Sequence, residues 1–186
     1  MPEHQPSPVV AGRITARAGP AVVAAVVTVL SFPVVAGVGM GAAIVILGGI
    51  AQTDDASHRI PNRLIVAAEL ALLATAAVRG QAAFASTAVV AAVWFLAFLG
   101  FHLADPRLGF GDVKLAGVLG SLLGLACSCP GWGIAHAALV SAAAFVAGGT
   151  LTLAKAARLG RDSPVPFAPG LVFAVVAVTV TIGLAT

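Results

Sequence analysis

Charged side chains are scarce in this chain of 186 residues. Lys and Arg together number 10 and Asp and Glu together number 7, so that charged residues make up 9% of the sequence. A water-soluble domain carries about 25% charged residues, and this chain therefore has too little polar surface to be covered by water. The hydrophobic share of 60% and the mean hydropathy of +1.06 agree with this interpretation. Lipid is the expected solvent for most of the molecule.

Cysteine and aromatic residues are also rare. The two cysteines, Cys127 and Cys129, are one residue apart. A disulfide across so small a ring would be strained, and two thiols are too few for a four-ligand zinc site. The sequence shows no histidine cluster, and we expect no metal and no cofactor. Aromatics make up 6% with no tyrosine, and the basic residues are spread over several loops, which argues against nucleic-acid binding by aromatic stacking.

Long apolar runs fill the sequence instead. A helix needs roughly 20 residues to cross a bilayer, which leaves room for six or seven spans and no separate soluble domain. We predict an all-α fold, a polytopic membrane helix bundle with six or seven transmembrane helices. Residues 1–18 form a cytoplasmic N-terminal tail and residues 19–186 a single membrane-embedded domain. The predicted spans are 20–36, 38–54, 63–79, 83–103, 113–128, 132–154 and 167–185.

The number of spans depends on the first two runs. Joined together, they would form a helix of about 52 Å, too long for a hydrocarbon core of roughly 30 Å, and Pro33 favours a break between them. Six spans remain if residues 20–36 lie at the membrane interface or are removed as a signal peptide, because Arg13 and Arg17 precede an apolar run.

Glycines recur inside the runs. In the segments 37–41 and 120–124, two glycines are four residues apart. Small residues at this spacing allow membrane helices to approach closely. We interpret these glycines as packing positions.

Basic residues fall almost entirely on one side of the predicted bundle. With the N-terminus placed in the cytoplasm, nine of the ten lie on the cytoplasmic side and Arg79 alone lies on the other. Cytoplasmic loops of membrane proteins carry an excess of Lys and Arg, and the asymmetry supports this orientation. The nine are Arg13, Arg17, Arg59, Arg63, Arg107, Lys114, Lys155, Arg158 and Arg161.

Acidic residues near a membrane are costly and are therefore functional candidates. Asp54 and Asp55 end the second predicted span, and Asp112 opens the fifth. The two spans between them carry the chain out and back, so both sites lie at the cytoplasmic boundary. Two carboxylates about 4 Å apart repel by roughly 4 kcal/mol at a dielectric of 20, enough to keep one protonated near neutral pH. Such a pair can activate water with one member and support the developing oxyanion with the other.

Each of these polar residues also has a structural interpretation. Asp112, in the glycine-containing segment 109–112, can cap a helix. Glu69 lies mid-span on the same helical face as Asn62, and we favour a neutral, hydrogen-bonded role inside the bundle over substrate binding. Lys114 either favours ionised Asp112 by its charge or is a lysine whose ammonium group reaches the membrane surface.

Three segments resemble the signature segments of the type IV prepilin peptidases, which are membrane aspartic peptidases with a Gly-x-Gly-Asp motif. They are Asp54 with Ile60-Pro61-Asn62 downstream, Gly109-Phe110-Gly111-Asp112-Val113-Lys114-Leu115, and Pro166-Phe167-Ala168-Pro169. The resemblance runs from about residue 38 to the end. It implies an α-helical protein of the bacterial cytoplasmic (inner) membrane that cleaves the short, basic leader from prepilins or pseudopilins, with its active site facing the cytoplasm.

The resemblance also implies roles for individual residues. The family's first catalytic acid stands seven residues before the proline of Ile-Pro-Asn, which selects Asp54 over Asp55, and the second is Asp112. Asp55 stands where the family usually has an apolar residue. Substrate binding or support falls to Gly109, Gly111, Lys114, Pro61, Asn62 and Glu69.

The chain departs from the full-length members of that family. Those members carry a zinc-binding segment with two Cys-x-x-Cys pairs, associated with N-methylation of the mature pilin, whereas this sequence has no such pair. It resembles the short form found with tight-adherence (Tad, Flp-type) pilus systems, which implies peptidase activity without methyltransferase activity. The expected partners are prepilin leaders and membrane lipid, and the oligomeric state stays open.

Two other functions fit paired acids in a membrane. A proton- or cation-coupled transporter also uses intramembrane carboxylates, but it predicts internal repeats with matching broken helices, which the sequence does not show. A noncatalytic membrane scaffold with structural acids is the third possibility.

Overall fold

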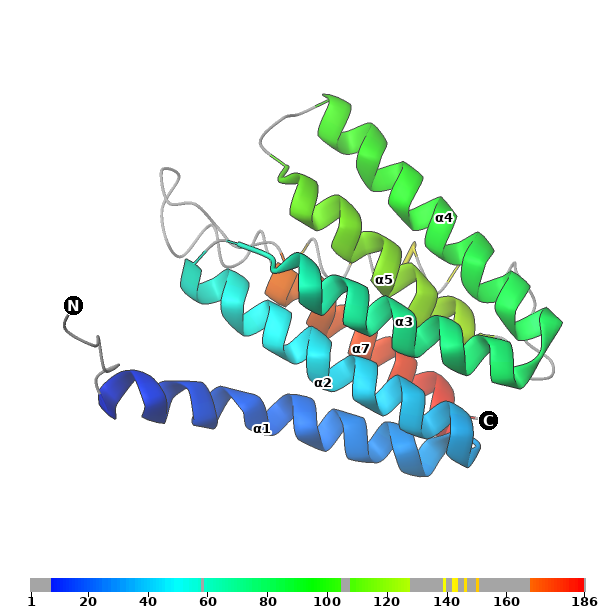
Figure 1. Cartoon of the computed structure of the whole chain (residues 1–186), viewed down its shortest axis with the longest axis horizontal. Helices are drawn as coiled ribbons and strands as arrows, with labels where there is room; N and C mark the ends of the chain where they lie inside the picture. The colour runs from blue at the N-terminus through cyan, green and yellow to red at the C-terminus, as the bar shows by residue number, and fades with distance from the viewer. Residues whose placement is uncertain are drawn as a thin grey trace.

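The computed structural model describes residues 8–57, 59–104, 108–127 and 168–185, together with isolated positions between 139 and 150. These residues form six α-helices and no strand (Figure 1), which confirms the all-α prediction. Apart from these isolated positions, the predicted span 132–154 lies outside the described residues. The helices are α1 (Pro8–Ser31), α2 (Val34–Ser57), α3 (Asn62–Arg79), α4 (Gln81–Ala104), α5 (Phe110–Ala126) and α7 (Ala168–Ala185).

The predicted break between the first two helices is present. Helix α1 ends at Ser31 and α2 begins at Val34. Pro33 has no N–H to continue α1, and its carbonyl accepts a hydrogen bond from the Gly37 N–H at 2.8 Å. Helix α1 begins at Pro8, within the segment assigned to the tail, because proline is well suited to the first position of a helix.

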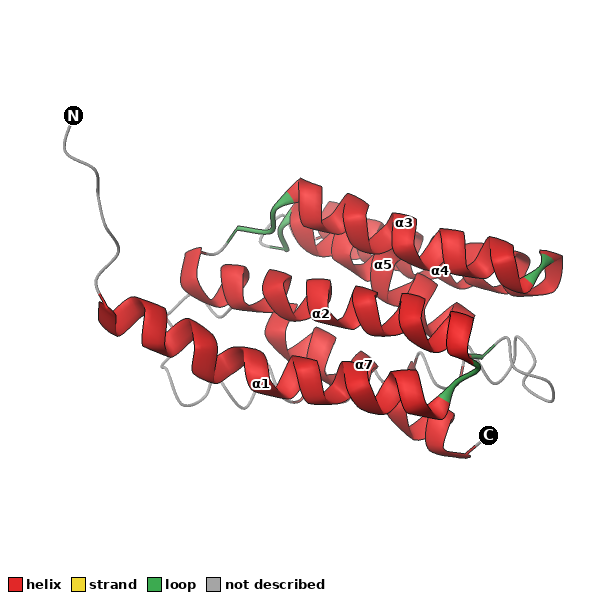
Figure 2. Cartoon of the chain, turned by 60° about the horizontal axis from the view of Figure 1, so that its bottom comes forward, coloured by secondary structure: helices red, strands yellow, loops and turns green. Residues whose placement is uncertain are grey.

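The helices form two layers of three. Helices α3, α4 and α5 pack together in one layer, and α1, α2 and α7 pack together in the other (Figure 2). Contacts of α2 with α3 and of α5 with α7 join the layers. Among the described residues, three helices are long and apolar enough to cross a bilayer, namely α2, α4 and α7.

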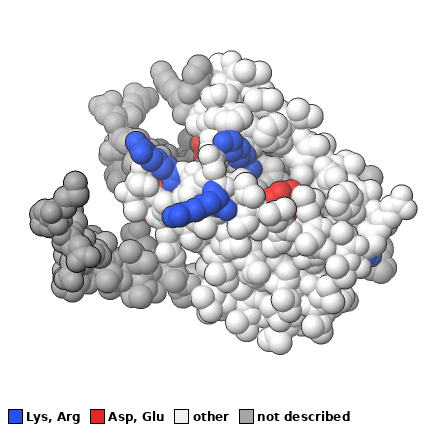
Figure 3. All heavy atoms as spheres, in the orientation of Figure 1, with Lys and Arg blue, Asp and Glu red and all other residues white. Residues whose placement is uncertain are grey.

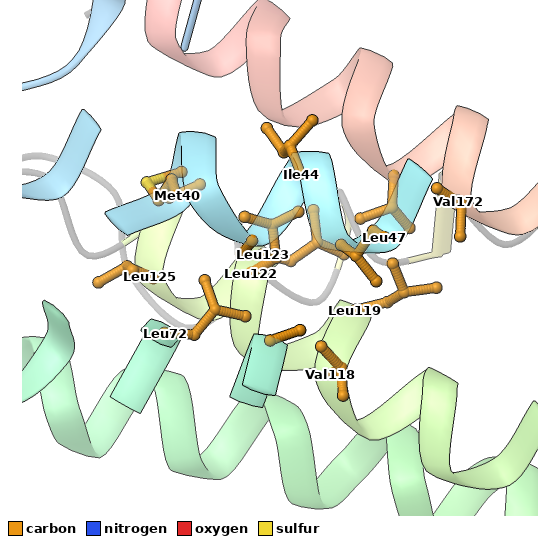
Figure 4. Close-up of a cluster of buried hydrophobic side chains, with 14 of the residues drawn as sticks. Met40, Ile44, Leu47, Leu72, Val118, Leu119, Leu122, Leu123, Leu125 and Val172 are labelled. Carbon is orange, nitrogen blue, oxygen red and sulfur yellow. The ribbon is translucent and has the colours of Figure 1, made fainter. Parts of the chain in front are cut away.

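The core lies between the two layers. Met40 and Leu47 of α2 lie on the side of Leu72 of α3 and the leucines of α5, and Ile44 is turned toward α7 (Figure 4). Every residue of α5 from position 118 to 126 is buried, since α5 contacts α3, α4 and α7. A helix that is apolar on all sides is typically buried in the protein interior. Helix α5 is therefore firmly held, and so is the segment at its start.

Glycines bring α5 unusually close to α4. A Cβ on Gly120 would lie 2.8 Å from the carbonyl oxygen of Val90, and a Cβ on Gly124 would lie 2.8 Å from that of Ser86. Real Cβ atoms do not approach backbone so closely, and larger residues would push the helices apart. Gly37 has the same role between α2 and α1. The interpretation of these glycines as packing positions is confirmed.

Candidate active site

Asp54 and Asp112 lie on two helices that the same neighbours hold in place. Asp54 is in the last turn of α2 and is buried, with 7% of its surface exposed. Asp112 is half-buried in the first turn of α5, just before the apolar segment that starts at Val113. Helices α3 and α7 each contact both α2 and α5. They therefore fix the position of one acid relative to the other.

The pKa of the Asp112 carboxyl is raised from its ordinary value of 3.8 to about 6. Burial is the largest cause, since it disfavours the charged form, and the negative charge of Asp54 is the second. A backbone hydrogen bond with Gly109 acts in the opposite direction. The effect of Asp54 shows that the two carboxyls interact electrostatically. A proton held on Asp112 therefore belongs to the pair and not to one residue in isolation.

Asp55 lies in a different environment from Asp54. It lines a pocket of about 880 Å³ between α1, α2 and α7, together with Gln52. Consecutive residues of a helix are rotated by about 100° from each other, and the two aspartates therefore face different neighbours. Of the two, it is Asp54 whose charge acts on the pKa of Asp112.

The loop before α3 lies against the start of α5. A Cβ on Gly111 would come within 3.3 Å of the Ile60 side chain, so the glycine makes room for this contact. Pro61 is the N-cap residue of α3, with an extended backbone. The first two predicted signature segments thus meet in space, at the level of Asp112.

Asp112 also has the helix-capping contact that we considered as an alternative. Gly109 is the N-cap residue of α5, and its carbonyl accepts the Asp112 N–H at 3.0 Å. The Asp112 carboxyl lies back over this glycine, because a Cβ on Gly109 would be 3.3 Å from Oδ2. Such a contact of the third residue with the N-cap is typical of a capping box. Capping fixes the direction of the carboxyl and leaves its acid–base chemistry available.

Two polar side-chain pairs join α3 to α5. Lys114 Nζ donates to Asn62 Oδ1 at 3.0 Å, and Ser121 Oγ donates to Glu69 Oε1 at 2.7 Å. In both pairs the α5 residue follows its α3 partner by 52 positions in the sequence. Helices α3 and α5 therefore run parallel, and the two pairs share the same register. The Lys114 ammonium also lies 5.0 Å from the centre of the Phe110 ring, a favourable cation–π distance. The structure therefore links Lys114 to Asn62 and Phe110.

Glu69 is hydrogen-bonded inside the bundle, as expected. Its partner Ser121 is a residue that sequence reasoning missed, because it stands alone in a run of Gly and Leu. The sequence holds only a partial signal: Asn62 and Glu69 are seven residues apart, and so are Lys114 and Ser121, but this spacing does not say which helices pack together. The second oxygen of Glu69, Oε2, is buried and has no hydrogen-bond partner among the described residues.

Basic side chains gather at the end of the molecule that holds the two acids. Figure 3 shows Lys and Arg grouped where α2 ends and α3 and α5 begin. Those described there are Arg59, Arg63 and Lys114. Arg79 lies at the opposite end of α3, where its Nη1 donates to the carbonyl oxygen of Leu125 at 2.9 Å. These four residues follow the predicted asymmetry of charge.

The described part of the third predicted signature segment lies at the start of α7. Ala168 is fully buried at the start of this helix, which packs on both α2 and α5. Pro166 and Phe167 lie outside the described residues. Within the described part of the chain, no three His, Cys, Asp or Glu side chains cluster closely enough to hold a metal ion.

The chain also matches a known protein family. Residues 41–153 match the sequence model of the type IV leader peptidase family. The matched part contains both Asp54 and Asp112 and is more than half of the chain. No curated protein and no solved structure gives a significant match. With its long apolar helices, the protein is an integral membrane peptidase, and the chain belongs to the type IV leader peptidase family.

Proposed function

We propose that this protein is an aspartic endopeptidase that removes the leader of type IV, Flp-type prepilins at the cytoplasmic face of the bacterial inner membrane. The observation that carries the proposal is the electrostatic interaction of buried Asp54 with the half-buried carboxyl of Asp112, in a member of the leader peptidase family. The absence of Cys-x-x-Cys pairs from the sequence supports the short form of the enzyme, which cleaves the leader and does not methylate the pilin.

The two acids have separate tasks in the proposed reaction. Ionised Asp54 takes a proton from a water molecule, and the water oxygen attacks the carbonyl carbon of the scissile peptide bond. Protonated Asp112 donates a hydrogen bond to the carbonyl oxygen as negative charge develops there. The proton taken from water then passes to the leaving nitrogen, and the C–N bond breaks. The reaction needs no nucleophilic side chain.

The surroundings of the acids suit an extended substrate. Gly109 is exposed beside the Asp112 carboxyl, and a residue without Cβ allows another backbone to approach. The contact of Ile60 with Gly111 holds the loop between α2 and α3 against α5. The substrate backbone can then reach Asp112 from the side of Gly109.

The test is leader removal in cells. Co-expression with a Flp-type prepilin is expected to yield the shortened pilin on a gel. Asp54→Asn and Asp112→Asn should each lower the cleavage rate by about a thousandfold, within the range for loss of a general acid or base. Asp55→Asn is the matched control and should keep near-normal cleavage. If Asp54→Asn and Asp112→Asn both cleave as fast as the wild type, at equal protein level in the membrane, the mechanism is disproved.

A further inference from the structure

The last turn of α4 lies beside the start of α5 (Figure 1). The two helices run antiparallel, since Ser86 and Val90 of α4 lie against Gly124 and Gly120 of α5, respectively. Continued along both helices, this register brings His102, in the last turn of α4, to the segment that precedes α5. The glycine contacts that hold α4 and α5 together therefore also place His102.

His102 is hydrogen-bonded to the backbone just before α5. Its Nδ1 lies 2.6 Å from the carbonyl oxygen of Leu108. A carbonyl oxygen can only accept, so Nδ1 carries a proton and donates the hydrogen bond. The centre of the His102 ring also lies 5.8 Å from that of Phe110. His102 therefore contacts the residues on both sides of Gly109, which is the N-cap residue of α5.

The peptide group between Leu108 and Gly109 links His102 to Asp112. Its carbonyl accepts the bond from His102, and its N–H belongs to Gly109. The Asp112 carboxyl lies over Gly109 and has a backbone hydrogen bond with this residue that lowers its pKa. A hydrogen bond with this effect stabilises the ionised carboxyl, so its donor is the Gly109 N–H. His102 and Asp112 thus bond opposite ends of one peptide group.

A peptide group transmits both direction and strength between its two ends. It is planar, so a fixed carbonyl oxygen also fixes the direction of the N–H. A hydrogen bond accepted by the carbonyl polarises the group and makes the N–H a stronger donor. Gly109 needs such a restraint because a residue without Cβ has more backbone freedom than any other.

We propose that His102 is a positioning residue for Asp112, acting through the Leu108–Gly109 peptide group to set the direction and strength of the hydrogen bond that the Asp112 carboxyl accepts. The proposal rests on the proposed function, in which Asp112 has to point at the carbonyl oxygen of the scissile bond. His102 needs no contact with the substrate in this role. Helix α4, which carries neither acid, thereby becomes part of the support of the acid pair.

The titratable groups around Asp112 come from several helices. Asp54 ends α2, Arg63 lies in the first turn of α3, and Lys114 follows on α5. Within the described ranges, α4 has His102 as its one titratable side chain, and α7 has none. Asp54 acts on the pKa of Asp112. Replacement of His102 leaves the other groups in place, and a changed pKa of Asp112 then reports on His102.

Two replacements separate the hydrogen bond of His102 from its ring contact. Asn carries an N–H on the atom next to Cγ, where His has Nδ1, but has no ring, whereas Phe has a ring and no N–H. Both remove the positive charge that an imidazole can acquire, so a difference between His102→Asn and His102→Phe cannot come from charge. Leu103→Ala is the control, because Leu103 follows directly on the same helix and is 75% exposed.

The first measurement is the pH–rate profile of Flp-type prepilin cleavage by the purified enzyme in detergent. His102→Phe should lower kcat about fivefold, as expected for one net hydrogen bond, and leave KM unchanged. The ionised form of Asp112 loses a bond, so the midpoint of the alkaline limb should rise by about half a pH unit. His102→Asn and Leu103→Ala should keep both values close to those of the wild type. A residue that only stabilises the fold would lower the rate without moving the midpoint.

A second measurement needs no turnover. The infrared C=O band of the protonated Asp112 carboxyl, identified by its loss in Asp112→Asn, is titrated in each variant. Its midpoint should be higher in His102→Phe than in the wild type and should return in His102→Asn. Equal midpoints in His102→Phe and the wild type, or a larger change in His102→Asn than in His102→Phe, would overturn the proposal. Failure of the proposed function is distinct, because the wild-type enzyme would then cleave no prepilin while the infrared midpoints still decide whether His102 acts on Asp112.

Discussion

Asp112 is held by the backbone of the helix that it begins. Its carboxyl lies back over Gly109, and its backbone N–H is bonded to the carbonyl of the same residue. Burial and the charge of Asp54 both favour the protonated form. The helix start thus supplies an oriented carboxylic acid, which is what the proposed reaction needs beside an ionised partner.

The protonation of Asp112 should be visible in the pH dependence of cleavage. Its pKa is raised to about 6, and the proposed working form carries the proton on Asp112. Ionisation above that pH removes the donor, and kcat/KM should therefore fall about tenfold for each pH unit above the midpoint. A pH–rate profile of leader cleavage by purified enzyme measures this.

Asp55→Asn serves as the control for this profile. Asp55 lines the pocket between α1, α2 and α7, and its replacement should leave the midpoint of the alkaline limb unchanged. A rate that stays constant or rises between pH 6 and pH 8 would contradict the assignment of the proton donor to Asp112.

Individual polar residues differ in how well the sequence predicted them. Asp54 and Asp112 could be located because acids are rare in the chain and these two stand at the ends of apolar runs. The pairing of Lys114 with Asn62, and of Ser121 with Glu69, could not be derived. These contacts depend on the register between α3 and α5, and register follows from packing of the whole bundle and not from local sequence.

The packing of helix α5 depends on its glycines. Its glycines face the backbone of α4, and its own surface is buried for most of its length. The helix also positions Asp112. Changes far along α5 should therefore affect both the stability of the protein and its activity.

Gly120→Ala should destabilise the protein. The added Cβ would lie 2.8 Å from the carbonyl oxygen of Val90 and 2.9 Å from the Cα of Ala91, so α4 and α5 have to separate. Overpacking of this kind costs about 1–3 kcal/mol. Thermal unfolding in detergent should show a lower midpoint than for the wild-type protein.

Gly49→Ala is the matched glycine replacement. A Cβ on Gly49, in α2, would meet nothing within 4 Å, and alanine is the better helix former. This variant should unfold at the same temperature as the wild type or slightly above it. Equal destabilisation by both variants would contradict the role assigned to the α4–α5 contact.

The helix ends were predicted more accurately in the middle of the chain than at its start. The predicted span 63–79 differs from α3 by a single residue, because Pro61 and Gly80 flank it. Helix α1 begins about three turns earlier than predicted, since the polar residues before position 20 mark the expected membrane boundary and not the end of the helix.

At the scale of the molecule, most of the charged residues that the structure describes lie at one end of two apolar layers. Arg59, Arg63 and Lys114 share that end with the two acids, and Arg79 lies at the other. The sequence predicted this distribution from loop charges alone. It could not predict the layers, because which helix packs on which depends on side-chain shape.

Cysteine labelling tests the orientation that this distribution indicates. Arg59→Cys and Gln81→Cys place single thiols at exposed positions at opposite ends of α3, in a chain whose Cys127 and Cys129 are replaced by alanine. Basic residues favour the cytoplasmic side. A membrane-impermeant maleimide should therefore label position 59 in inverted inner-membrane vesicles and position 81 in right-side-out vesicles. The reverse pattern would place the acid pair on the outer face.

The equal spacing of the two links between α3 and α5 has a consequence for how the sequence can change. Insertion of a single residue between Lys114 and Ser121 would turn everything after it by about 100°. Ser121 would then face away from Glu69 while Lys114 kept its contact with Asn62. We expect substitutions in this interval to be tolerated far more often than insertions or deletions. Surviving length changes should occur as pairs, one in each helix.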